Sequence, residues 1–277
     1  MYRLKYASAT TFKYLTLIVG VFCALAPLVV VVFASFKTSK EYLNSSALAP
    51  PSDWFNFDNY RTAFVKGHML TGFKNTLIIM VTALVGNMLV GTMIAYVLQR
   101  FAFKGRGIIM SLFLFAALIP GVTTQVITFK IINALELFNT MGSAILLYMG
   151  TDIIGIYIFI QFMDNISTQL DESAMLDGAS YFTIFAKIIF PLLAPAIITM
   201  MIIKGIGIYN DFYIPFLYMP DPSLRTISTS LFAFKGPFGS HWETICAAVM
   251  LIIIPTAVVF VALQKWIYNG FMQGAVK

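Results

Sequence analysis

Six long apolar segments constrain this chain more than any other feature of its sequence. They cover approximately residues 14–36, 75–98, 107–131, 142–163, 192–219 and 244–266. About 20 apolar residues in a helix are enough to cross the hydrocarbon core of a bilayer. Only 11% of the residues are charged, against about 25% in a soluble domain, so few polar side chains are left to cover a soluble surface. We therefore predict an all-α, polytopic membrane protein with six transmembrane helices in a single domain, residues 1–277.

The positions of lysine and arginine predict which side of the membrane each connection faces. Cytoplasmic connections are enriched in these two residues. Arg100, Lys104 and Arg106 lie close together in the short connection between the second and third segments. Residues 37–74, between the first and second segments, spread five cations over 38 positions. We place the short connection and both termini in the cytoplasm, and residues 37–74 outside.

Cysteine and histidine give no sign of a disulfide framework or a metal site. Cys23 and Cys246 both fall inside apolar segments, where a thiol behaves as a small hydrophobic group. His68 and His241 lie in different external loops, with no metal-binding motif around them. Ala24-Leu25-Ala26 resembles a signal-peptidase site, but the apolar run continues beyond it, so we expect an uncleaved first span.

The loop at residues 164–191 is unusual, because it is acidic on the side where membrane proteins prefer basic residues. It contains four acidic residues and one base, Lys187. Within it, Thr168-Gln169-Leu170-Asp171 fits a capping box, which predicts a helix that begins there. Gly178 predicts either its end or a point of close backbone approach. The loop is therefore expected to contain a short helix outside the membrane.

This short helix is predicted to be amphipathic. Its apolar residues recur at helical spacing, and they are Met175, Leu176, Ala179 and Phe182. Helices that lie on anionic lipid carry lysine and arginine on their polar face, whereas this one carries acids. A groove in a partner protein is therefore the better site for the apolar stripe.

The same loop carries a resemblance to a known family. Glu172-Ser173-Ala174, followed at fixed spacing by Gly178, Ile188 and Pro191, resembles the EAA loop of binding-protein-dependent ABC importers. The pattern in that family is E-A-A-x3-G-x9-I-x-L-P, and here Ser173 and Phe190 depart from it. The sugar-importing branch, with the smaller maltose-type permease, is most similar. The resemblance implies a type I ABC importer permease fold, and an ATPase-coupling role for Glu172, Ser173, Ala174, Met175, Leu176, Asp177, Gly178, Ala179, Phe182, Ile188 and Pro191.

Resemblance to this family extends over essentially the whole chain. The matching pieces are short, and they are Asn59-Tyr60, Asn75-Thr76, Ala95-Tyr96, Arg100-Phe101, Leu137-Phe138-Asn139-Thr140 and Asn210-Asp211-Phe212.

The resemblance implies several partners, and the sequence itself supports one of them, a separate ATPase. The phosphate-binding motif G-x-x-x-x-G-K-[ST] does not occur in it. We expect a non-catalytic permease that binds no cofactor or metal, with ATP and Mg on a separate ATPase. The expected partners are two copies of that ATPase, a second homologous permease, an external sugar-binding protein, membrane lipid and the sugar itself. Nucleic acid is not expected, because the cations are scattered.

Polar residues inside the fifth segment are candidates for the sugar pathway. Charged residues at membrane depth usually face a cavity or a partner. Lys130, Asp152 and Lys204 favour structural roles, whereas Asp211 follows two glycines and an asparagine that interrupt the apolar run. Such interruptions let a helix loosen where it lines a cavity. We predict a pathway role for Tyr209, Asn210, Asp211 and Tyr213, with packing against the partner permease as the alternative.

Two other classes of protein compete with this interpretation. An ion-coupled secondary transporter would need no ATPase, but we find no inverted repeat with matching buried carboxylates. A membrane-embedded enzyme would need a polar catalytic cluster, and the sequence shows none. The interpretation predicts residence in the cytoplasmic (inner) cell membrane, and leaves open which sugar is carried.

Overall fold

The computed structural model describes residues 2–150, 153–236 and 239–275. The chain forms two compact units, residues 1–70 with 230–258 and residues 71–229 with 259–277. We describe each unit separately.

The first unit is built around the loop that follows the first apolar segment. Its helices and strands are α1 (Tyr2–Phe36), α2 (Ser39–Asn44), α3 (Asp58–Lys66), the 3₁₀ turn η4 (Leu231–Phe234), β1 (Lys235–Gly236), β2 (Gly239–Ser240) and the beginning of α15 (Trp242–Ala275). The two short strands pair antiparallel, Lys235 opposite Ser240. Near Pro50-Pro51-Ser52-Asp53-Trp54 the chain turns, and the Asp53 carboxylate accepts a hydrogen bond from the Phe55 backbone N–H at 2.8 Å.

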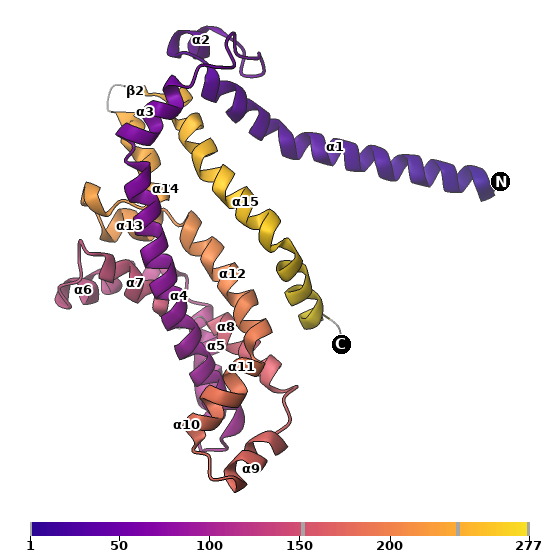
Figure 1. Cartoon of the computed structure of the whole chain (residues 1–277), viewed down its shortest axis with the longest axis vertical. Coiled ribbons are helices and arrows are strands. Elements are labelled where there is room, and N and C mark those ends of the chain that lie inside the picture. Colours follow the sequence, from indigo (N-terminus) through magenta and orange to yellow (C-terminus); the bar gives the residue numbers. More distant parts are fainter. Residues whose placement is uncertain (1, 151–152, 237–238, 276–277) are drawn as a thin grey trace. The chain divides into compact units, whose positions relative to one another are not determined.

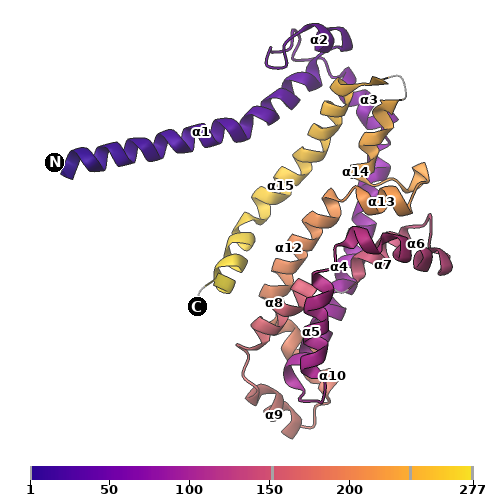
Figure 2. The same cartoon turned by 180° about the vertical axis from the view of Figure 1, so that it is seen from behind.

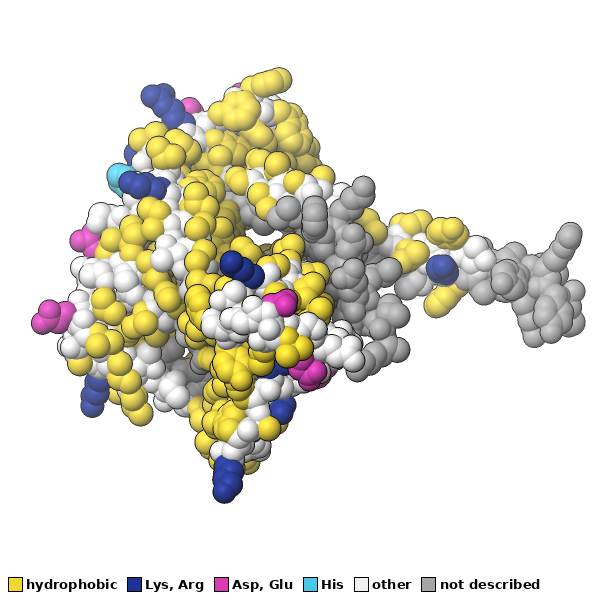
Figure 3. Space-filling model, turned by 60° about the horizontal axis from the view of Figure 1, so that its bottom comes forward, with side chains coloured by type: hydrophobic (Ala, Val, Ile, Leu, Met, Phe, Trp, Pro, Cys, Tyr) yellow, Lys and Arg dark blue, Asp and Glu magenta, His cyan; other side chains and the backbone are white. Residues whose placement is uncertain are grey.

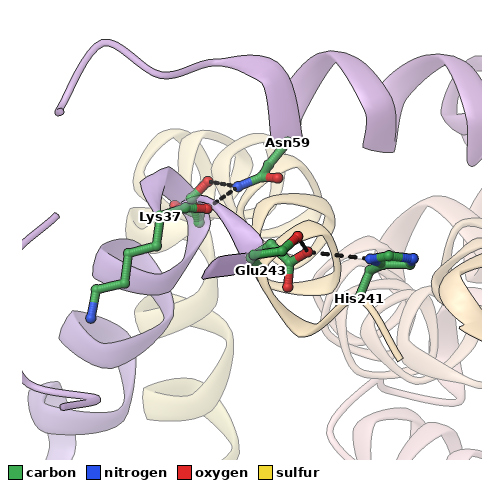
Figure 4. A network of polar contacts seen from close by, with 6 residues as sticks. Lys37, Asn59, His241 and Glu243 are labelled. Carbon is green, nitrogen blue, oxygen red and sulfur yellow. Dashed lines mark hydrogen bonds and ion pairs between the residues drawn. The ribbon is translucent and has the colours of Figure 1, made fainter. Parts of the chain in front are cut away.

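Polar side chains form hydrogen bonds around the C-terminal end of α1 (Figure 4). The Asn59 amide donates to the carbonyl oxygens of Ser35 and Lys37, at 3.0 and 2.8 Å. These carbonyls belong to the last turn of α1 and the residue after it, where helical partners are missing. Glu243 is buried and accepts a hydrogen bond from Ser39 at 2.6 Å. The Lys37 side chain points away from Glu243.

The second unit contains most of the helices. They are α4 (Met69–Arg100), α5 (Arg106–Ala117), η1 (Gly121–Thr124), α6 (Gln125–Ala134), α7 (Met141–Met149), α8 (Ile153–Met163), α9 (Gln169–Leu176), α10 (Tyr181–Ile184), the π-helical turn η2 (Phe185–Ile189), α11 (Phe190–Leu192), α12 (Ala194–Asn210), α13 (Tyr213–Tyr218) and η3 (Pro222–Leu224). The sequence passes from one unit to the other within α4, α14 (Ile227–Ser230) and α15.

Three helices of the described chain are long and apolar enough to cross a membrane, and three bent pairs raise the number to six if each pair is one span. The single helices are Phe12–Phe36, Met69–Arg100 and Trp242–Ala262. The pairs are Arg106–Ala117 with Gly121–Ala134, Met141–Met149 with Ile153–Met163, and Tyr181–Leu192 with Ala194–Asn210. Each overlaps one predicted segment, although the fifth begins earlier than predicted and ends at Asn210.

The bend in the fifth pair has a clear cause in the sequence. Pro191 has no N–H to donate, and the turn before it widens, so that the Phe190 N–H bonds to the Phe185 carbonyl five residues back. Pro195 then stands in the first turn of α12, where proline is tolerated. The two halves meet at an angle of 71°.

Two apolar clusters form the core of the second unit. The larger joins the C-terminal half of α4 to α8 and to the α10–α12 region, and its buried members include Tyr96, Phe159 and Ile189. The smaller joins the N-terminal half of α4 to α7 and the end of α12, around Tyr148. Helices α4 and α12 run side by side in both views (Figures 1 and 2). The larger cluster reaches the loop that carries α9.

Candidate functional site

Helix α9 is the centre of the candidate coupling site. It lies between two of the helix pairs that are long enough to cross a membrane, and belongs to neither. Figures 1 and 2 both show it beyond α10, near the end of the second unit where α4 finishes. The predicted short helix outside the spans is confirmed.

The end of α9 confirms the predicted role of Gly178. Its φ is +81°, a left-handed conformation that glycine adopts without strain. The Gly178 N–H bonds to the Met175 carbonyl at 3.0 Å, and the Ala179 N–H bonds to the Ala174 carbonyl at 2.9 Å. These two bonds make a Schellman motif, which satisfies carbonyls left over at the helix end.

The beginning of α9 differs from the predicted capping box. Thr168 makes no side-chain capping bond, and the Gln169 N–H bonds instead to the Ser167 hydroxyl at 3.3 Å. Asp171 is turned inward and is only 6% exposed. Its Oδ2 lies 2.8 Å from Nε of Arg100, the last residue of α4. The carboxylate that was expected to cap the helix forms a buried ion pair instead.

Burial raises the pKa of the Asp171 carboxyl above its ordinary value. Arg100 opposes this rise and the neighbouring Glu172 adds to it. Ionisation of Asp171 is therefore less favourable in the fold than in water.

The predicted apolar stripe does not continue along one helix. Leu176, on α9, is 89% exposed, whereas Ala179 follows the helix and packs against the larger core cluster, as Ala174 does. Phe182 is 70% exposed but belongs to α10, so its predicted place on the same short helix was wrong. Of the remaining predicted coupling residues, Ile188 is half-buried and Glu172, Ser173, Met175, Asp177, Gly178 and Pro191 are exposed. Figure 3 views the molecule from the α9 end, where apolar side chains surround a few acidic and basic groups. An exposed apolar face therefore lies next to acidic residues.

Two residues at the end of α4 contact this loop, and the sequence reading did not assign them to the site. The Gln99 amide donates to the Asp164 carboxylate, and Arg106 donates to the Gln99 carbonyl oxygen at 3.0 Å. Arg100 also donates to the Ile166 carbonyl oxygen at 2.8 Å. The sequence shows Arg100 as a cation of the short connection after the second apolar segment and as part of the family-like piece Arg100-Phe101. Neither observation pairs it with Asp171.

The four predicted pathway residues meet at the junction of α12 and α13. The Asp211 carboxylate accepts bonds from the Tyr213 N–H at 2.7 Å and from the Tyr148 hydroxyl at 2.9 Å. Asn210 is exposed, and its amide donates to the Ile206 carbonyl at 3.0 Å. Tyr209 is half-buried and Tyr213 is 44% exposed. Asp211 thus holds the start of α13, while Asn210 and Tyr213 are accessible.

The interruption of the fifth span lies at Asp211 rather than at the two glycines. Gly205 and Gly207 are both inside the continuous helix α12. Gly205 is buried, and a Cβ there would lie 3.6 Å from Leu84 of α4. That distance is an ordinary van der Waals contact, so the packing of α4 against α12 would admit a Cβ at this position. The predicted interruption is therefore present at the Asn210-Asp211 end of the stretch, while its two glycines remain helical.

A buried amide in α4 was also missed by sequence reading. Asn87 is 4% exposed, and its amide donates to the Gly150 carbonyl at 2.8 Å, at the end of α7. Its position inside an apolar segment was the available signal. Of the other polar residues in the spans, Lys130 is exposed, Lys204 is half-buried, and Asp152 lies outside the described residues.

Comparison with known proteins identifies the family. The family model for the binding-protein-dependent transport system inner membrane component matches residues 87–272. The probable starch degradation products transport system permease protein AmyC of Thermoanaerobacterium thermosulfurigenes is 30% identical, over 96% of this chain and 97% of its own. The galactooligosaccharides transport system permease protein GanQ of Bacillus subtilis is 31% identical, over 96% and 95%.

A solved structure gives the fold independently. A chain of a bacterial ABC transporter involved in the import of the acidic polysaccharide alginate matches with a TM-score of 0.81. The match covers 92% of this chain and 95% of that one, at 18% identity. The fold is therefore that of an ABC importer permease, with each bent helix pair counted as one of six spans. The chain belongs to the family of binding-protein-dependent transport system inner membrane components.

Proposed function

We propose that this chain is one of two permease subunits of an ATP-driven sugar importer, and that α9 docks into a separate cytoplasmic ATPase. The observation that carries the proposal is the pair of exposed apolar side chains near the end of α9, Met175 and Leu176, which are 40% and 89% exposed and lie outside the spans. Burial of each of these side chains in a partner would contribute about 1.5–3 kcal/mol. The surface is sufficient for a specific contact.

A protein groove suits this face better than a lipid surface. Glu172 and Asp177 are exposed beside the apolar residues, and anionic lipid would repel them. An amphipathic helix seated in a groove uses a few apolar anchors, and the acidic rim then favours a basic partner surface. Glu172 and Gly178 both face solvent and are available for this contact.

The substrate class follows from the relatives. The two permeases compared above are named for starch degradation products and for galactooligosaccharides. We propose that this chain carries an oligosaccharide or several related sugars. An external binding protein would deliver the sugar, as the name of the family implies.

The remaining parts of the proposal concern partners and placement. This chain would form half of the translocation pathway and a second, homologous permease the other half, with two ATPase copies that hold ATP and Mg. Both termini, the α4–α5 connection and α9 would face the cytoplasm. The dense cations of Arg100, Lys104 and Arg106 support this orientation.

Asn210 and Tyr213 are the residues we propose for contact with the sugar. Both are exposed at the α12–α13 junction. An amide can exchange hydrogen bonds with sugar hydroxyls, and an aromatic face can cover the apolar side of a sugar ring. Tyr209 and Asp211 would shape the junction around them.

Copurification tests the docking role of α9. Leu176→Asp places a charge at the centre of the exposed face, and should reduce the ATPase recovered with the tagged permease at least tenfold. Phe55→Asp is the matched control, because Phe55 is 85% exposed in the external loop, and this variant should keep the ATPase. Equal recovery with both variants would contradict docking through α9.

A further inference from the structure

The end of α4 contacts both sides of α9. Before and within α9, Arg100 bonds to the Ile166 carbonyl at 2.8 Å and pairs with Asp171 at 2.8 Å. After α9, the Phe101 ring lies 5.0 Å from the Tyr181 ring, centroid to centroid, in an edge-to-face arrangement. Polar and aromatic contacts therefore hold α9 against the same turn of α4.

Both members of the ion pair are almost completely buried. The side chains of Arg100 and Asp171 are 7% and 8% exposed. Within the described part of the chain, Oδ1 of Asp171 and Nε of Arg100 are buried without a hydrogen-bond partner. The 2.8 Å contact between Nε and Oδ2 is therefore an ion pair without hydrogen-bond geometry.

This pair is a poor source of stability. Desolvation of a buried charge is costly, and the attraction of its partner often does not repay it. The raised pKa of the Asp171 carboxyl shows that desolvation outweighs the attraction of Arg100 here. The position of the pair, between the last residue of α4 and the first turn of α9, is therefore its more informative property.

We propose that the Arg100–Asp171 pair is a latch that fixes α9 to the cytoplasmic end of α4, so that the two helices move together. This inference rests on the proposed docking of an ATPase on α9. Displacement of α9 by the ATPase is then passed directly to α4, which packs along α12 next to the α12–α13 junction. Arg100 and Asp171 are positioning residues, since neither is exposed enough to contact the ATPase or the sugar.

The latch also gives a role to the acidic side chain of Asp171, which pairs with Arg100 and does not cap α9. An acid at the start of a helix is favoured by the helix dipole, but here its carboxylate is used for a long-range contact. At the beginning of α9, the Gln169 N–H donates a hydrogen bond to the Ser167 hydroxyl.

The test compares a variant that keeps the packing with one that leaves the pair intact. In Arg100→Met/Asp171→Leu, apolar side chains of similar volume replace both charges, an exchange that folded proteins often tolerate. Lys104→Gln is the control, because it removes an exposed cation from the same connection. Both are assembled with the partner permease, the ATPase and the binding protein in proteoliposomes. Uptake of a radiolabelled mixture of starch-derived and galactose-containing oligosaccharides is measured together with ATP hydrolysis.

We expect the double variant to retain the ATPase and to lose coupling. The sugar transported per ATP hydrolysed should fall at least tenfold, and amide hydrogen exchange in residues 169–176 should become at least tenfold faster. Lys104→Gln should match the wild type in both. The latch is overturned if the double variant transports sugar per ATP hydrolysed within twofold of the wild type, or if its amide hydrogen exchange in residues 169–176 is unchanged. It is also overturned if the double variant alone fails to accumulate in the membrane, because the pair would then be a requirement for folding. Wild-type permease that retains no ATPase would instead refute the proposed docking, while the exchange measurement still reports on the latch.

Discussion

Amide side chains attach loop backbones to the spans of this protein. Asn75, near the start of α4, donates to the carbonyls of Ser223 and Arg225 at 2.9 and 3.0 Å. The Asn87 amide donates to the Gly150 carbonyl, and the Asn59 amide donates to the Ser35 carbonyl at the end of α1. A backbone carbonyl buried away from water needs such a partner. The short sequence pieces that suggested the family therefore include contacts that hold loops in place.

Asn210 and Asp211 are adjacent, but they should respond differently to mutation. Asn210→Ala removes an exposed amide, so uptake should fall at least tenfold while the melting temperature in detergent changes little. Asp211→Ala removes an acceptor of the Tyr213 N–H and of the Tyr148 hydroxyl, and each unsatisfied donor costs about 1–3 kcal/mol if it stays buried. Asp211→Ala should therefore lower both uptake and melting temperature. Unchanged uptake in Asn210→Ala would remove that residue from the pathway.

At the scale of elements, some helix ends follow local sequence, whereas others depend on contacts with distant residues. The Schellman end of α9 was predictable, because Gly178 adopts a conformation that other residues avoid. The six apolar segments were also predictable, because each is a run of consecutive apolar residues in the sequence. The end of α12 was not predictable, because it depends on hydrogen bonds between Asp211 and Tyr148 of α7, far away in the sequence.

Replacement of Gly178 tests the importance of the α9 ending. Gly178→Ala places a Cβ at a φ of +81°, which should cost about 1 kcal/mol and weaken ATPase recovery, since α9 and the chain after it would shift. Gly107→Ala is the control, because a Cβ there meets no atom within 4 Å and alanine favours the helix. Thermal unfolding in detergent and copurification measure the two effects. A Gly178→Ala protein as stable as Gly107→Ala would contradict the assigned strain.

The pairing of Arg100 with Asp171 shows where sequence reasoning ends for the candidate site. Both residues were noticed, one as an interfacial cation and the other as a helix-capping acid. Each local role is physically sound by itself, and only the fold brings the two side chains to 2.8 Å. The coupling motif was recognisable from local spacing, whereas its connection to α4 was not.

At the scale of the whole molecule, orientation in the membrane determines which surfaces meet which partners. The α4–α5 connection and α9 must lie on the ATP side if α9 docks an ATPase. The loop that contains Trp54 and Phe55 must then face the binding protein. Both assignments come from the distribution of lysine and arginine.

Cysteine labelling tests this orientation. In a background with Cys23→Ala and Cys246→Ala, single cysteines are placed by Phe55→Cys and Lys104→Cys, both at exposed positions. A membrane-impermeant maleimide should label Phe55→Cys in intact protoplasts or spheroplasts, and Lys104→Cys only after the membrane is opened. The reverse pattern would invert the topology.

The energy source of transport tests the central claim most directly. The chain is purified with its partner permease, ATPase and binding protein, and uptake of the oligosaccharide mixture is measured in proteoliposomes with ATP on the α9 side. We predict uptake that requires ATP, proceeds without an ion gradient and is unaffected by an uncoupler. Uptake that survives the removal of ATP and is abolished by an uncoupler would show an ion-coupled transporter, and would contradict the account.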